Sequence, residues 1–361
     1  MKTYIKIFFI RLLFILPVFH SCNENTIEPK PSSFNWPVST PEQQNMSSQL
    51  IDQAFQQGEN MGFVDCILVI RNGFLVAEKY YNGYTKNTPH NVMSVSKSFL
   101  SAMTGIALRD EIIDSLNVKV LGYFPEYIYP SIDPRKFEIT IRHLLMMRMG
   151  IDYEQNNYIQ IYNSANWIKT TIELPLLYDP GTKFYYNTFQ THLLSAIITK
   201  ASGTSTFDFA KRYLLEPMEV ECAQWQQDPQ GYYFGGNSMF FTPRNMARLG
   251  YLYLNNGNLG GTQIVPEEWV EESLTNYTGY NNLSWGDLDD YNYGYLWWLG
   301  KIKGHEVFLA IGHGGQFVIN FPDLNMIVVT TSYWQLDWET ADEHERAVLS
   351  IVANYIVPSV N

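Results

Sequence analysis

Runs of β-branched and aromatic residues near both ends of the chain predict the strands of one antiparallel sheet. Residues 67–70 and 74–81 are mostly apolar and flank Asn72-Gly73, a preferred turn of β-hairpins. Three further short apolar runs lie in the last third of the chain, at 306–311, 316–321 and 326–331. Because all five have the length and residue types of strands, we expect them to pair in one sheet.

The middle of the chain follows a helical period instead. Residues 94–108 place apolar side chains three and four positions apart, and the same spacing recurs at 141–147, 191–201, 207–215 and 243–254. An amphipathic run at 341–357 closes the chain. This order predicts an α+β fold, with an antiparallel sheet flanked by helices and a mainly helical insertion domain. We place the sheet domain at 41–109 plus 256–361, and the helical domain at 110–255.

The first residues of the chain predict export. A basic start is followed by an apolar run at 7–19, which is too short to span a bilayer. The run ends at Ser21-Cys22 in a sequence similar to a bacterial lipobox, so we expect residues 1–22 to be a signal peptide of the lipoprotein type with Cys22 lipidated. Residues 23–40 would be a linker. The protein would then be anchored in the cell envelope by its lipid. Ordinary cleavage, giving a soluble periplasmic or secreted protein, is the alternative.

Composition excludes some classes of partner and cofactor. The 361 residues carry a formal net charge of −12 and, after the first residues, no cluster of Lys and Arg, so we do not expect a nucleic-acid partner. The histidines are scattered and no cysteine spacing suits zinc, so we expect neither a metal nor another cofactor. Cys66 and Cys222 could pair in an oxidising compartment or remain as buried thiols.

Ser94 and Lys97 form a candidate catalytic pair. Positions three apart share a helix face, and a serine in the first helical turn lies where backbone N–H groups and the helix dipole favour negative charge. A lysine kept from water has a lowered pKa and can accept or relay the serine proton. The alternative is a capping serine followed by a solvated lysine.

Two later segments complete a pattern with this pair. Residues 180–188 read Pro-Gly-Thr-Lys-Phe-Tyr-Tyr-Asn-Thr, and His313-Gly314-Gly315-Gln316 lies at the start of a predicted strand. In this order, behind the hairpin, the three motifs resemble those of the serine β-lactamase and penicillin-binding-protein family. They are most similar to its class C-related branch of esterases, D-aminopeptidases and aminohexanoate-oligomer hydrolases. The resemblance runs from about residue 41 to 357.

The resemblance implies a role for each matching residue. Ser94 would attack the substrate carbonyl and Lys97 would take or relay its proton. Tyr186, with Tyr185 as the rival position, would be a phenolate stabilised by the lysine; it would take the serine proton and later return one to the leaving group. Thr188 stands where the family usually has Asn, so it would donate to a substrate carbonyl.

The third motif would form one wall of the site. His313 replaces the lysine of many family members and would face Tyr186 and the substrate, while Gly314 and Gly315 would let the strand approach the substrate. The N–H of Gln316 would join that of Ser94 as an oxyanion hole. Because that lysine is associated with a substrate carboxylate in true β-lactamases, its loss argues against good β-lactam turnover.

The sequence therefore predicts a serine hydrolase that cleaves a small-molecule ester, amide or peptide-like substrate through a Ser94 acyl-enzyme. A cell-wall DD-peptidase or transpeptidase, a weak β-lactamase, and a non-catalytic envelope binding protein remain as alternatives. An α/β hydrolase is excluded because the chain has no Gly-x-Ser-x-Gly. Aromatic residues at 285–298 would either stack on a substrate or pack in the core.

Overall fold

The computed structural model describes residues 34–361 except 281. The predicted signal peptide, Cys22 and most of the predicted linker lie outside the described residues. Within the described part of the chain, no helix has both the length and the apolar character needed to cross a membrane.

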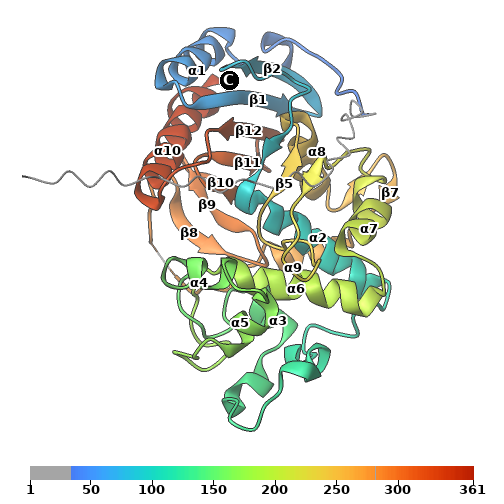
Figure 1. Cartoon of the computed structure of the whole chain (residues 1–361). Coiled ribbons are helices and arrows are strands. Elements are labelled where there is room, and N and C mark those ends of the chain that lie inside the picture. Colours follow the sequence, from blue (N-terminus) through green and yellow to red (C-terminus); the bar gives the residue numbers. More distant parts are fainter. Residues whose placement is uncertain (1–33, 281) are drawn as a thin grey trace, which may run out of the picture.

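The centre of the fold is a seven-stranded antiparallel sheet with the strand order β2-β1-β12-β11-β10-β9-β8 (Figure 1). The predicted hairpin forms β1 and β2, and the three predicted C-terminal runs form β10, β11 and β12, so the predicted fold class is confirmed. The strand bounds are β1 Val64–Arg71, β2 Phe74–Tyr80, β8 Asp289–Tyr293, β9 Trp298–Ile302, β10 His305–Gly312, β11 Gln316–Phe321 and β12 Met326–Ser332.

Alternate residues of the central strands enter two separate hydrophobic cores. Leu68 and Ile70 pack with α2 (Ser96–Arg109) and α8 (Pro243–Leu254) on one face. Ile67 and Val69 pack with α1 (Ser48–Met61) and α10 (Trp338–Ile351) on the other face (Figure 1). Because side chains alternate along a strand, a slip of one residue would exchange the two cores, and this fixes the register.

Most of the remaining helices lie beside the sheet, below it in Figure 1. The longest, α6, begins at the cap residue Asn187, whose side chain accepts from the N–H of Phe189, and ends at Gly203 with φ of 70°. It packs against α2, α3 and α5. The bounds in this group are α3 Ile141–Leu145, α4 Tyr158–Tyr162, α5 Trp167–Glu173, α6 Thr188–Ser202, α7 Thr206–Ala210 and α9 Glu267–Ser273.

The predicted helices differ from the observed ones mainly at their ends. The segment predicted at 207–215 is α7 followed by a π-helical turn, and α10 likewise ends in a π turn. Helix α8, which the sequence assigned to the helical domain, packs on β1, β11 and β12. The two-domain division remains a prediction.

Short strands outside the large sheet complete the secondary structure. A three-stranded sheet joins β3 (His90–Asn91), β5 (Met239–Phe241) and β4 (Gln224–Trp225), and a small hairpin joins β6 (Asn258–Leu259) to β7 (Thr262–Gln263). The first of these connects the segment before Ser94 to the segment after residue 236, and so brings two parts of the site together.

Both described cysteines, Cys66 and Cys222, are free and buried. The open question between a disulfide and two thiols is thereby answered in favour of thiols.

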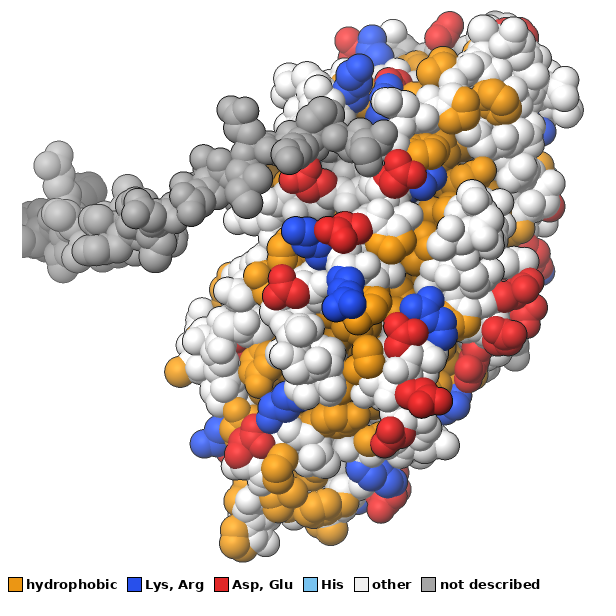
Figure 2. All heavy atoms as spheres, turned by 90° about the vertical axis from the view of Figure 1, so that its right-hand side faces the viewer, with side chains coloured by type: hydrophobic (Ala, Val, Ile, Leu, Met, Phe, Trp, Pro, Cys, Tyr) orange, Lys and Arg blue, Asp and Glu red, His pale blue; other side chains and the backbone are white. Residues whose placement is uncertain are grey.

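On the side of the molecule that lies to the right in Figure 1, acidic and basic side chains are interspersed with hydrophobic ones, as Figure 2 shows.

Candidate active site

Ser94 lies in a tight turn that leads directly into α2. The 3-10 turn Met93–Val95 precedes Ser96, the first residue of the α-helix. Met93 has φ of 50°, a conformation that non-glycine residues rarely adopt. Two hydrogen bonds hold it there: its N–H donates to Asn91 Oδ1 at 2.9 Å, and its carbonyl accepts from Ser96 Oγ at 2.7 Å. The Ser94 side chain is therefore presented at the start of a buried helix, as the sequence predicts.

Lys97 lies one turn further on and contacts Ser94 directly. Its Nζ donates to Ser94 Oγ at 2.7 Å, to Thr188 Oγ1 at 3.0 Å and to the carbonyl of Gly236 at 2.8 Å. The Lys97 side chain is buried, so the alternative prediction of a solvated lysine is wrong. Burial lowers the pKa of Lys97 to about 8, against the opposing effect of the Glu154 carboxylate.

Tyr186, rather than Tyr185, reaches this centre. The Lys97 ammonium lies 4.9 Å from the centroid of the Tyr186 ring, and the Tyr186 side chain interacts with that of Ser94, with which it lines one pocket. Tyr185 turns away and donates to the hydroxyl of Tyr178 at 3.0 Å. Burial, together with Tyr293 and the Glu154 carboxylate, holds the pKa of Tyr186 well above its ordinary value. Tyr186 therefore rests as the neutral phenol, and its predicted proton transfer with Ser94 stays a prediction.

Thr188 and the Gly235-Gly236 loop form the buried side of the site. Thr188 is 2% exposed, and its hydroxyl is occupied by Lys97. Its predicted contact with a substrate carbonyl stays a prediction, since the contact that the structure shows is with the lysine. A Cβ added to Gly236 would lie 2.5 Å from Thr191 Oγ1, so only glycine brings this carbonyl within reach of Lys97.

The third motif forms a turn between β10 and β11. Gly314 and Gly315 have φ of 82° and 102°, and a Cβ on Gly314 would lie 2.7 Å from the Tyr333 carbonyl oxygen. The structure thus requires these glycines for the turn and for packing against the chain after β12, which is a different reason from the predicted approach to substrate. His313 does lie on the pocket wall, and its Nε2 contacts the Leu336 carbonyl at 3.0 Å.

The structure shows a supporting role for the Gln316 side chain. It is buried, donates to the carbonyl of Ser332 at 2.7 Å and accepts from its N–H at 3.0 Å. Gly312, opposite Gln316 in the β10–β11 ladder, is so close to Val92 that an added Cβ would lie 2.4 Å from its carbonyl oxygen. This end of the ladder therefore lies against the Ser94 turn, and the predicted oxyanion hole stays a prediction.

Ser94, Tyr186 and His313 share one pocket of about 510 Å³. Its other lining residues come from a 3-10 turn, the segment before α6, the loop between α9 and β8, the strands β8, β9 and β10, and α10. They are Tyr153, Glu154, Gln155, Phe184, Tyr280, Leu283, Trp285, Tyr291, Trp298, Ile311, Trp338, Asp342 and Glu345. Of the aromatic run at 285–298, Trp285, Tyr291 and Trp298 line the pocket, whereas Tyr293, Tyr295 and Trp297 are buried in the core.

The sequence did not single out the three carboxyl groups of the pocket. Glu154 is buried, and its Oε2 accepts from the Thr188 N–H at 2.7 Å. Glu345 accepts from the Gly314 N–H at 2.9 Å, and burial raises its pKa to about 8. Asp342 lies one helical turn before Arg346 and pairs with it at 2.6 Å. A glutamate on the inner face of the C-terminal amphipathic helix was the available signal for Glu345. No such signal in the sequence exists for Glu154. Among the described residues, no group of three or more His, Cys, Asp or Glu side chains could hold a metal ion.

Comparison with known proteins places this geometry in a family. The family model described as Beta-lactamase matches residues 49–353. The 6-aminohexanoate-dimer hydrolase of Paenarthrobacter ureafaciens is 26% identical over 291 residues, which cover 75% of this chain and 72% of that protein.

Solved structures share the fold. EstCE1, a hydrolase with promiscuous acyltransferase activity, has a TM-score of 0.69 at 15% identity, with 87% of this chain and 99% of that one covered. A D-stereospecific amidohydrolase from Streptomyces has a TM-score of 0.63 at 14% identity, with coverages of 84% and 97%. Because the family match spans most of the chain, this chain belongs to the β-lactamase family and is a serine hydrolase.

Proposed function

We propose that the protein cleaves carboxylic esters or amides through an acyl-enzyme on Ser94. The observation that carries this proposal is the 2.7 Å hydrogen bond between Lys97 and Ser94, made by a buried lysine whose pKa is lowered to about 8. At pH 7 about a tenth of such lysines are neutral, far more than for a lysine in water. A neutral amine beside a serine hydroxyl is a general base in position.

The three contacts of Lys97 support this direction of proton transfer. The Gly236 carbonyl can only accept, and Thr188 Oγ1 is a second acceptor, so the two N–H groups of the neutral amine are directed to them. The amine lone pair then faces Ser94. In the acylation step Ser94 Oγ forms a bond to the substrate carbonyl carbon while its proton passes to Nζ. The tetrahedral intermediate then expels the alcohol or amine, and water later releases the acid.

In this proposal Tyr186 is a proton relay and not a resting base. Its raised pKa keeps the phenol protonated at neutral pH, so the hydroxyl can pass its proton to the leaving group while it receives one from the Lys97 ammonium. The N–H groups of Ser94 and Gln316 would stabilise the oxyanion, and the position of Ser94 at a helix start supports that assignment.

Labelling with a fluorophosphonate probe tests the nucleophile. We expect a single adduct on the wild-type protein, located by peptide mass spectrometry at Ser94, and no adduct on Ser94→Ala. Equal labelling of the two proteins would contradict the assignment. Labelling of neither would favour a binding protein that retains the fold only.

We also propose that the protein is exported and anchored by a lipid on Cys22. The basic start, the short apolar run and the lipobox-like end at Cys22 support this. Expression of the full chain and of Cys22→Ser, followed by fractionation of the cells, tests the anchor. We expect the wild-type protein in the membrane fraction and the Cys22→Ser variant outside it. An equal distribution of both would contradict the anchor.

A further inference from the structure

The ionisable groups that line the Ser94 pocket are, apart from His313 and the tyrosines, all carboxyls. Glu154, Asp342 and Glu345 face it, and no Lys or Arg is among the described residues that line it. Lys97 lies beneath Ser94, 1% exposed, with all three of its Nζ contacts made to protein oxygens. A substrate carboxylate that enters this pocket therefore meets three carboxyl groups and no available lysine or arginine.

His313 does not supply that cation in its neutral form. The Leu336 carbonyl can only accept a hydrogen bond, so Nε2 of His313 carries the proton that joins them. The other ring nitrogen, Nδ1, then presents a lone pair. Neutral His313 thus adds one more acceptor to the pocket.

The carboxyl groups of α10 are held in place by neighbouring donors. Asp342 Oδ1 accepts from Trp285 Nε1 at 2.7 Å, and Glu345 Oε1 accepts from the Gly314 N–H. Glu345 is largely protonated at neutral pH, since its pKa is about 8, and a cation bound beside it would favour its ionised form. Arg346, which is half exposed and outside the lining, is the group that offsets Asp342.

Aromatic rings supply the rest of the pocket wall. Trp298 stacks on Tyr186 at 5.5 Å and on Tyr291 at 4.9 Å, with interplanar angles of 22° and 12°. At the mouth of the pocket, Tyr153 and Trp338 are 41% and 46% exposed. Aromatic faces attract ammonium groups, and the attraction grows when the cation loses water. An apolar body with a cationic end therefore fits both features of this wall.

We propose that the pocket selects esters or amides that carry a cationic amine on an apolar or aromatic body, and rejects those that carry a carboxylate. This inference rests on the proposed Ser94 chemistry and names the substrate class of the same pocket. It also gives α10 a function: the helix that covers one face of the sheet supplies the specificity of the site through Asp342 and Glu345.

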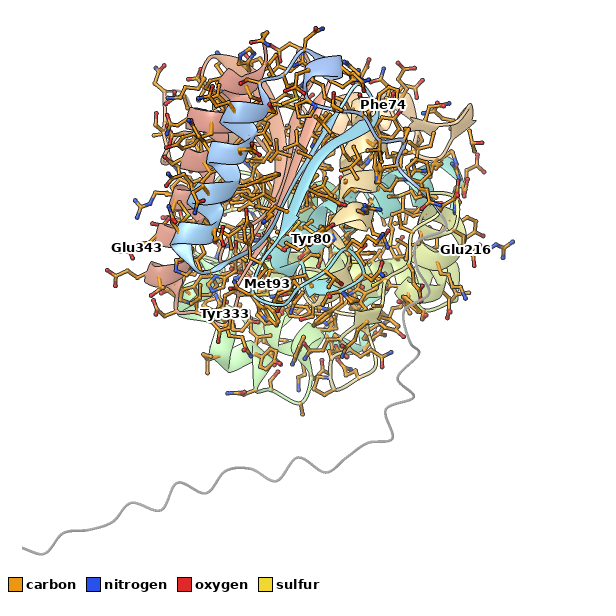
Figure 3. All side chains as sticks on the ribbon, turned by 90° about the horizontal axis from the view of Figure 1, so that it is seen from above. Phe74, Tyr80, Met93, Glu216, Tyr333 and Glu343 are labelled. Atoms are coloured by element: carbon orange, nitrogen blue, oxygen red, sulfur yellow. The ribbon has the colours of Figure 1, made fainter. Side chains whose placement is uncertain are left out.

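Three p-nitrophenyl esters of matched length test the proposal. The probes are 4-(trimethylammonio)butanoate, its neutral isostere 5,5-dimethylhexanoate, and the mono-ester of glutarate. We expect kcat/KM at low salt to be about tenfold higher for the cation than for the isostere, and lowest for the anion. The ratio of cation to isostere should fall in Asp342→Asn and in Glu345→Gln, and rise in Arg346→Gln, which frees Asp342. Glu343→Gln is the matched control, because Glu343 is an exposed acid of the same helix that projects outward in Figure 3; it should leave the ratio unchanged.

A ratio of one or less in the wild type, or a preference for the glutarate ester, would overturn the proposal. Binding of phenyltrimethylammonium to the Ser94→Ala variant repeats the test without catalysis, and tryptophan fluorescence measures this binding. Saturable quenching that weakens in the Asp342→Asn background supports the proposal, and its absence overturns it. If none of the esters turns over and no fluorophosphonate adduct forms, the Ser94 chemistry fails, while the binding experiment still decides on the pocket.

Discussion

The catalytic floor of the pocket, made of Ser94, Lys97, Tyr186, Thr188 and Gly236, differs in construction from its aromatic and acidic wall. In the floor, a buried lysine makes three hydrogen bonds within 3.0 Å to protein oxygens. In the wall, large rings such as Trp338 stand half exposed at the mouth. A proton can be transferred only over short, fixed distances, whereas recognition of a substrate body tolerates looser contacts. The floor therefore defines the reaction, and the wall defines what the reaction is performed on.

The largest expected effect comes from removing the base of the floor. Lys97→Met should slow fluorophosphonate labelling by about a thousandfold, because the serine loses its proton acceptor. The measurement is the second-order labelling rate at pH 8. Lys169→Met is the control, since Lys169 lies on the surface of α5 beside Glu173 and should label at the wild-type rate. A rate within tenfold of wild type in Lys97→Met would remove the lysine from the mechanism.

The next effect separates two adjacent tyrosines. Tyr186→Phe should lower kcat for an ester by about a hundredfold through loss of the proton relay, whereas Tyr185→Phe should change it less than about threefold. Both changes remove one hydroxyl, so the pair is matched. Equal effects would mean that the contact of Tyr186 with Ser94 has no role in catalysis.

A smaller effect is expected from pH. Neutral Lys97 is the reactive form and its pKa is about 8, so the labelling rate should rise about tenfold from pH 7 to a plateau above pH 9. Glu154→Gln should move this profile to lower pH, because the Glu154 carboxylate raises the pKa of Lys97. Rates measured in overlapping buffers at constant ionic strength decide this. A flat or falling profile would contradict the lysine as base.

The smallest effect concerns stability and belongs to the wall. The pKa of Glu345 is raised to about 8 in the folded protein, so between about pH 4.5 and 8 the folded state keeps a proton that the unfolded state releases. Its contribution to stability is thus full at low pH and is lost as the pH rises towards 8. The melting temperature of Glu345→Gln should fall less across this window than that of wild type, while Glu343→Gln should follow wild type. Parallel curves for all three would show that Glu345 is not buried as described.

The difference between the floor and the wall of the pocket also explains how much of the site could be predicted from the sequence. Ser94 and Lys97 are three positions apart, and Tyr186 and His313 stand in motifs whose order is recognisable, so the floor was predictable. The sheet was predictable because its central strands are continuous apolar runs. The carboxyl group of Glu154 reaches the floor through packing of distant segments, and no local sequence pattern marks it. The edge strands β8 and β9, interrupted by polar residues and a glycine, lack the alternation that marks a strand.

The pairing of β1 with β12 has a consequence for the order of folding. Asn72 and Asn325 are joined across the ends of these strands by a side-chain hydrogen bond between residues 253 positions apart. Such non-local contacts form slowly, because a long loop must close before the contact is gained. The Ser94 turn packs against β10 and β11, which join the N-terminal hairpin through β12. A chain still lacking its last third on the ribosome therefore holds Ser94 without the strands that complete its site, and hydrolytic activity arises only after synthesis is finished.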